Sequence, residues 1–120
     1  MSTAIFRRTI LFVAGLLGLV GIAAAAAASH GSDPRLIGGI SAMCLAHAPA
    51  LVALYAAYEK FATAGVAAAL LGAGTIIFAG DLAVRLAFGH GLFPMAAPIG
   101  GMTMMAGWLA VALGAFWRQN

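Results

Sequence analysis

The residues that could carry chemistry lie inside apolar sequence, and the clearest pair is Asp81 and Arg85 in the segment from Phe61 to Phe88. A charged side chain at the centre of a bilayer costs about 2.5 to 3.5 kcal/mol on insertion scales, so such residues face a bundle interior, a wet cavity or a partner. Their i, i+4 spacing, with the acid first, favours an ion pair on one helix face. We expect this pair to fix its helix against neighbouring helices, and the alternative is a role in transport or a proton relay.

His47 lies near the middle of another apolar run, with Met43 and Cys44 about one turn earlier. Thioether, thiolate and imidazole groups suit copper(I), so the pattern M-C-x-x-H could form a soft-metal site. Three such residues on one helical turn, without a second cluster, are more often packing residues beside one hydrogen-bonded histidine. We therefore assign no metal and no cofactor, and we treat a hydrogen bond between His47 and Asp81 as a hypothesis.

Further polar groups lie in the two connecting segments at the opposite end from the chain termini. These groups are His30, Asp33, Arg35 and His90. They could form a metal or proton-handling cluster, but loop polarity and helix capping account for the same residues. His30 and His90 are therefore candidate polar residues, and no metal is assigned to them. The sequence has no H-E-x-x-H, nucleophile elbow or phosphate-binding glycine loop, so we expect no catalytic residues and no enzyme.

The composition determines which elements can position these residues. Hydrophobic residues make up 64% of the 120-residue chain and charged residues only 8%. So few charges cannot cover the surface of a soluble domain of this length, whereas a lipid bilayer requires no such cover. The formal net charge of +3 is scattered at the ends of apolar runs. A nucleic-acid partner is therefore not expected, because that would need basic residues clustered on one face.

Four apolar runs are long enough to cross a membrane at about 1.5 Å per residue. They cover residues of about 9–28, 36–58, 61–88 and 95–117. The first run could instead be a secretory signal peptide, because arginines precede it and an alanine run ends it. The short connections favour neighbouring antiparallel helices. We predict an all-α integral membrane bundle of four transmembrane helices, arranged up-down-up-down, that forms a single domain over residues 1–120.

The positive charges predict the orientation of this bundle. The end that carries both termini and the middle connection holds most of the basic residues, which are Arg7, Arg8, Lys60 and Arg118. The opposite end holds Arg35, with Arg85 near its edge. Because cytoplasmic loops are enriched in Lys and Arg, both termini are expected to be cytoplasmic, in a bacterial inner membrane.

Small residues indicate where helices approach one another. Gly100, Thr103, Gly107 and Gly114 follow one seam of the fourth run, which we therefore expect to be an interior element. Trp108 lies deeper on the same run than an aromatic belt would, and it is expected to be a packing residue. Four methionines surround the start of this run, namely Met95, Met102, Met104 and Met105. Adaptable packing is the preferred explanation for them, and a binding surface for another membrane subunit is the alternative.

Three stretches resemble the small membrane proteins of the domain of unknown function 423 family. AAAASHG is similar to a family run that ends in A-H-G, and MCLAHAPALVAL is similar to a Y-H-A-L-A-L-like stretch, with His47 at the histidine. The third stretch, from FAGDL to ALGAF, resembles a G-S-L-Y stretch, then a T-P-x-G-G turn and a G-W-L helix, with Asp81 where the family pattern has serine. Its matching residues are Gly80, Pro98, Gly100, Gly101, Gly107 and Trp108. The resemblance implies four membrane helices and no settled activity, and it places Asp81 and Arg85 among the departures from the family pattern.

These observations favour a structural or accessory membrane protein that acts by helix packing with itself or with a larger membrane complex. Its expected partners are the lipid bilayer and other membrane subunits or a second copy of the chain. The alternative is an oligomeric transporter of small solutes, ions or protons that uses Asp81 and His47. The packing residues expected to matter most are Pro98, Gly100, Gly107 and Gly114.

Overall fold

A computed structural model describes residues 2–31 and 33–117 of the chain. Over these residues it contains four α-helices and one short 3₁₀ turn, and it contains no strand. The helices are α1 (Thr3–Ala28), α2 (Pro34–Ala56), α3 (Ala64–Phe88) and α4 (Ala96–Leu113), and the 3₁₀ turn η1 is Gly114–Phe116. All four helices are long and apolar enough to cross a membrane, α4 together with η1. The predicted all-α fold with four membrane-spanning helices is confirmed.

Local sequence signals set the helix ends. The Ser2 hydroxyl accepts a hydrogen bond from the Ile5 N–H at 3.2 Å, so α1 begins at Thr3 and includes the basic residues ahead of the predicted apolar run. The Asp33 carboxylate accepts from the Leu36 N–H at 3.4 Å, and Pro34 is the first residue of α2. Proline suits this position, because the N–H groups of a helix's first turn have no partner within the helix and proline lacks an N–H. The helix then continues through Pro49.

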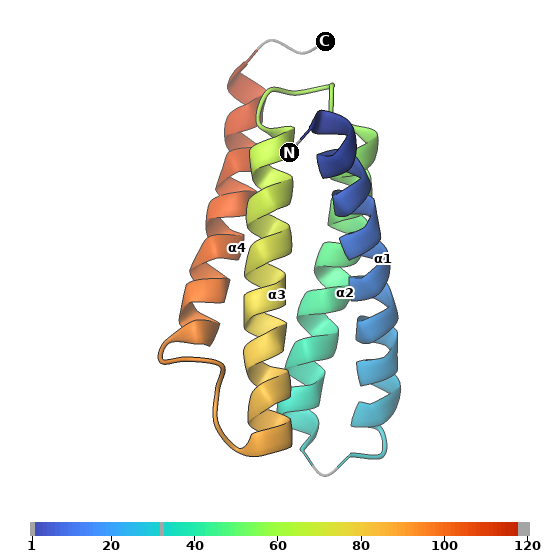
Figure 1. The fold of residues 1–120 in the computed structure, drawn as a ribbon, viewed down its shortest axis with the longest axis vertical. Coiled ribbons are helices and arrows are strands. Elements are labelled where there is room, and N and C mark those ends of the chain that lie inside the picture. The colour runs from blue at the N-terminus through green and yellow to red at the C-terminus, as the bar shows by residue number, and fades with distance from the viewer. Residues whose placement is uncertain (1, 32, 118–120) are drawn as a thin grey trace.

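The helices form two closely packed pairs (Figure 1). α1 packs along α2 and α4 packs along α3, and contacts between α2 and α3 join the two pairs. Consecutive helices run in opposite directions, so α2 and α4 run the same way. Because α2 and α3 join the two pairs, α1 and α4 lie at opposite edges of the molecule. Which side of a membrane holds the helix ends stays a prediction, and the predicted marker Arg118 lies outside the described residues.

The expectation that the fourth helix is an interior element is wrong. Met102 and Leu109 of α4 are 65% and 59% exposed, and Trp108 is also exposed, at 46%. Only one stripe of α4 is buried, and it contains Gly100, Met104 and Gly107. The glycine seam is therefore real, but it brings α4 against one neighbour, α3, and leaves the rest of the helix uncovered.

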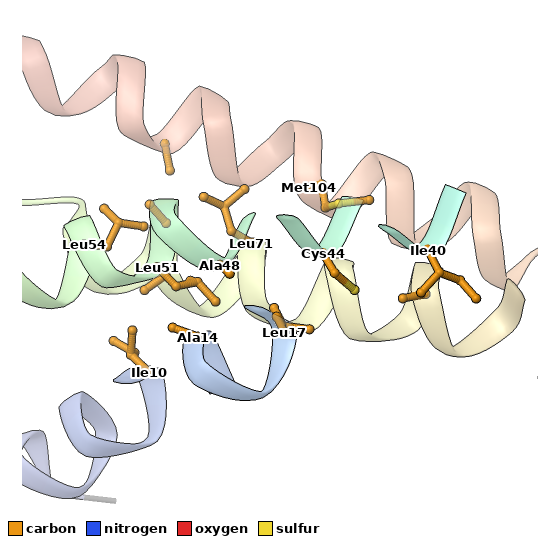
Figure 2. Packing of buried hydrophobic residues seen from close by; sticks show 14 of the residues in the cluster. Ile10, Ala14, Leu17, Ile40, Cys44, Ala48, Leu51, Leu54, Leu71 and Met104 are labelled. Atoms are coloured by element: carbon orange, nitrogen blue, oxygen red, sulfur yellow. The ribbon is translucent and has the colours of Figure 1, made fainter. Parts of the chain in front are cut away.

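The core lies along the middle of the two helix pairs and is made of small and branched apolar side chains (Figure 2). Leu51 of α2 and Leu71 of α3 are among the largest fully buried side chains. Cys44 is also fully buried, on the side of α2 that faces this cluster. The small side chains around these residues let the helices approach closely, and that approach accumulates van der Waals contact.

Two hydroxyl groups join helices through backbone carbonyls. The Ser41 hydroxyl of α2 donates to the Gly21 carbonyl of α1 at 3.0 Å, and Thr63 donates to the Ala110 carbonyl of α4 at 2.5 Å. Each bond satisfies a polar group that would otherwise lie in an apolar surrounding. Each helix pair is therefore held by one such hydrogen bond. The Ser41 bond holds α1 to α2, and the bond of Thr63, the residue before α3, holds α4 to α3.

Candidate functional site

Asp81 lies almost completely buried on α3, at 1% exposure. Its Oδ2 is 3.4 Å from Arg85 Nη2, and its Oδ1 accepts a hydrogen bond from the Leu92 N–H at 2.9 Å. The predicted i, i+4 ion pair is confirmed. The bond to Leu92 was not foreseen, because the residues between Asp81 and Leu92 do not show which N–H returns to the carboxylate. Both carboxylate oxygens therefore hold partners in the same chain.

Two glycines allow the connection after α3 to fold back onto Asp81. Gly89 ends α3 in the left-handed conformation, with a φ of 79° that glycine adopts without steric cost. A Cβ atom on Gly91 would overlap the Asp81 carboxylate and would lie 2.6 Å from Arg85 Nη2. The carboxylate therefore fastens the segment that leads from α3 into α4, which is an anchoring role.

His47 is buried on α2 and bonds to two other groups. The Trp108 indole N–H, which can only donate, lies 3.1 Å from His47 Nε2, so Nε2 must accept. The ring proton of a neutral imidazole is then on Nδ1, which donates to the Met43 carbonyl at 2.9 Å. His47 and Trp108 therefore tie α2 to α4 across the surface of the molecule.

The direct hydrogen bond proposed between His47 and Asp81 is not formed. His47 is paired with Trp108, whereas Asp81 is held at the far end of α3 by Arg85 and Leu92. A sequence gives the depth of each residue along its helix, but it does not show which way each side chain points. Trp108, expected only to pack, is the partner that sequence reasoning missed.

A surface groove surrounds the histidine and tryptophan pair, and we call it the methionine groove. It has a volume of about 550 Å³ between α2 and α4, with α3 behind it. Its lining residues are Met43, His47, Phe78, Pro98, Gly101, Met102, Met104, Met105 and Trp108. Pro98, expected at a helix contact, is exposed in this groove on the first turn of α4. Three of the four methionines predicted to surround the start of the fourth helix therefore lie in one hollow.

The three residues of M-C-x-x-H do not point to one place. Met43 and His47 line the methionine groove, whereas Cys44 is fully buried and faces the core. A single helical turn spreads consecutive residues about 100° apart, which separates Cys44 from the other two. The ligand set imagined from these three residues alone is not assembled.

The two loop histidines, His30 and His90, do not come together in one site. The ring of His90 stacks on Phe88, with ring centroids 6.0 Å apart, and its Nδ1 lies 3.0 Å from the Gly91 carbonyl oxygen. His30 is exposed in the turn after α1, while Asp33 caps α2. Over the described ranges, no three His, Cys, Asp or Glu side chains are grouped as a metal site would require. These residues serve the local turns.

A second groove lies between α1 and α3, over α2, and we call it the alanine groove. It consists of two adjoining hollows of about 270 and 450 Å³ that share Phe6 and Ala69. Their other lining residues are Thr9, Ile10, Val13, Leu51, Tyr58, Ala62, Gly65, Val66, Ala68, Gly72, Ala73 and Ile76. The hollow exists because α1 and α3 make only limited contact with each other.

One end of the alanine groove is held by an arginine that sequence reasoning treated only as a topology marker. The Arg7 guanidinium lies over the rings of Tyr55 and Tyr58, at 5.5 and 5.2 Å from their centroids. It also lies 3.6 Å from the Glu59 carboxylate, and Phe6 meets Tyr58 edge to face. Aromatic rings attract a cation above their faces, so this cluster joins the start of α1 to the end of α2.

Comparison with known proteins identifies a family. The family model described as a protein of unknown function, DUF423, matches residues 24–101, which is 78 of the 120 residues. The matched segment contains His47, Asp81 and Gly100, whereas Trp108 and Gly107 lie beyond its end. No curated protein and no solved structure matches the chain.

Proposed function

We propose, since the chain belongs to the DUF423 family of proteins of unknown function, that it is a small accessory subunit in a bacterial inner membrane. In this proposal, a transmembrane helix of another membrane protein packs into the alanine groove. The subunit acts by binding and supporting that helix. It contributes no catalytic group.

The pattern of residues along the open face of α3 carries this proposal. Val66, Ala69, Ala73 and Ile76 are all exposed and line the alanine groove. Their spacings of three, four and three residues keep them on one stripe of the helix, as in the contact seam of two packed helices. Small residues in such a stripe let another membrane helix approach closely.

The shape of the groove supports the same occupant. α1 provides one wall through Ile10 and Val13, and Leu51 of α2 forms the floor. From Val66 to Ile76 the stripe rises about 15 Å at 1.5 Å per residue, which is nearly three helical turns. This is enough length for a partner helix to interdigitate side chains along the seam.

A photocrosslinking experiment tests the proposal. The full chain carries a photoreactive amino acid at Ala73, and the matched position is Ala106, an exposed alanine of α4 that lines neither groove. Irradiated membranes are then analysed for one crosslinked partner of defined mass. We expect a membrane protein crosslinked from position 73 and not from position 106.

A pair of variants makes the result specific to the groove. Ala73→Phe should fill the groove and release the crosslinked partner from a native-detergent preparation, while Ala106→Phe should retain it. A crosslinked dimer of the chain would replace the accessory role with self-association. Proton or solute flux in liposomes by the purified chain alone, lost in Asp81→Asn, would favour the transporter alternative over the accessory role.

A further inference from the structure

We propose that the methionine groove is a binding site for one monovalent soft metal ion, Cu(I) or its analogue Ag(I), held by His47 Nε2 and methionine thioethers from both α2 and α4. Along the sequence, the M-C-x-x-H pattern has no second group of metal ligands near it. The fold supplies that group from α4, which runs in the same direction as α2 and reaches it across the groove through the Trp108–His47 hydrogen bond.

The order of the methionines along the groove follows from two helices that run in the same direction. Met43 precedes His47 by four residues on α2, and Met104 precedes Trp108 by four residues on α4. Each helix therefore carries a methionine one turn before its member of the histidine and tryptophan pair. Met104 is buried against Gly74 of α3 and forms part of the wall of the groove. The parallel direction of α2 and α4 brings these methionines to the same end of the groove. Met105 of α4 lines the same groove and is 65% exposed.

The imidazole is already arranged as a metal ligand. Histidines that bind metals commonly donate the other ring N–H to a carbonyl or carboxylate, which fixes the tautomer and the ring orientation. His47 Nδ1–H donates in this way to the Met43 carbonyl at 2.9 Å. The lone pair of Nε2 then points into the groove, where the Trp108 N–H contacts it at 3.1 Å. A soft cation would replace that N–H and would displace no proton from the imidazole.

The chemistry of the groove selects the charge and softness of the ion. Thioether and imidazole ligands suit Cu(I), whereas hard divalent ions take oxygen ligands. No carboxylate lines the groove, so the lining would leave a divalent ion with both charges uncompensated in apolar surroundings. A monovalent ion carries the smaller penalty, and the Trp108 ring at the groove wall can attract it through its face.

Silver titration of the purified full-length protein in detergent tests the site, because Ag(I) needs no reductant. Cys44→Ala serves as the parent, so that the buried thiol cannot supply the binding. We expect one tightly bound Ag(I) per chain by equilibrium dialysis, together with quenching of Trp108 fluorescence. Cu(I) should then compete for the same site under ascorbate.

Volume-conserving variants separate the site from general methionine affinity. Met43→Leu with Met104→Leu should weaken Ag(I) binding at least 10-fold, and His47→Gln should do the same. Met95→Leu changes an exposed methionine outside the groove and should leave the affinity unchanged. Trp108→Phe removes the competing N–H, so binding should stay or tighten while the quenching is lost.

Three outcomes would overturn the proposal. They are the absence of saturable binding in the Cys44→Ala parent, equal affinity in the Met43→Leu, Met104→Leu double variant, and equal loss of affinity in Met95→Leu. If His47→Gln fails to fold, the double variant still decides the question, because exchanging methionine for leucine keeps the packed volume.

Discussion

The two faces of α3 use small residues for different purposes. On the face covered by α4, glycines allow backbone to touch backbone: a Cβ on Gly74 would lie 2.8 Å from the Gly100 carbonyl oxygen and from the Met104 nitrogen. On the face toward the alanine groove, Ala69 and Ala73 are exposed. The covered face therefore requires glycine and has no space to spare, whereas the open face has space that the isolated chain does not use.

This difference predicts opposite behaviour for changes on the two faces. A substitution on the covered face should reduce the stability of the chain itself. A substitution on the open face should leave stability unchanged and affect only the binding of a partner helix. The variants below test that separation by comparing residues of similar type on the two sides.

The largest effect should come from leucine at Gly74, with leucine at the adjacent Ala73 as the matched variant. Gly74→Leu forces α4 away from α3, and overpacking of this kind costs about 3 kcal/mol. Ala73→Leu places its side chain in the open groove and should change stability by less than about 0.5 kcal/mol. Denaturation in mixed detergent, followed by circular dichroism, measures both. Equal losses would show that the two faces do not differ in packing.

A smaller loss is expected for Asp81→Ala, which frees the connection that delivers α4 to its place on α3. The variant removes the acceptor of the Leu92 N–H and the partner of Arg85. Hydrogen bonds to a charged group contribute about 1.5 to 3 kcal/mol, so we expect a loss of about 2 kcal/mol. The rate of backbone amide hydrogen exchange should rise in residues 89–95 and stay unchanged within α1 and α2.

The matched variant for this test is Arg85→Ala. The Arg85 side chain is 47% exposed, so water screens its charge, and its removal should cost less than about 1 kcal/mol. An equal loss in Arg85→Ala and Asp81→Ala would mean that the ion pair, and not the bond to Leu92, fastens the connection.

A gain in stability is expected for Gly72→Ala, on the open side of α3. The added Cβ would lie 3.8 Å from the nearest atom, Cδ1 of Leu51, which is ordinary contact. Glycine costs a helix about 0.5 to 1 kcal/mol relative to alanine, so the variant should be more stable by about that amount. Gly100→Ala is the contrasting variant, because its Cβ would meet the Phe78 nitrogen at 2.7 Å. If both variants were more stable than the parent, the close backbone contact between α3 and α4 at Gly100 would be contradicted.

The helices and the ion pair were predictable because they depend on short spacings. Apolar run length predicted four spanning helices, and the i, i+4 rule predicted the contact of Asp81 with Arg85. The glycine seam predicted a close helix contact, and Gly100 and Gly107 make it with α3. Each of these inferences uses residues on one helix, where the geometry is known before the fold.

The remaining features depend on how separate helices are placed. Nothing near His47 in the sequence shows that Trp108 will reach it, and a seam on α4 does not show how many neighbours that helix has. The error about α4 arose from reading one packed stripe as complete burial. The open groove could not be foreseen either, because it results from the limited contact between α1 and α3.

The smallest effect should distinguish a hydroxyl that joins helices from one that bonds its own helix. Thr63 donates to the Ala110 carbonyl of α4, whereas Thr103 donates at 2.7 Å to Ile99 of its own helix. Hydrogen bonds between membrane helices contribute on average about 0.6 kcal/mol, so Thr63→Val should lose about that amount. Thr103→Val should be neutral within error, since it removes no contact between helices. Repeated unfolding measurements on both variants in one detergent would resolve the difference, and an equal loss would mean that Thr63 does not hold α4 to the covered side of α3.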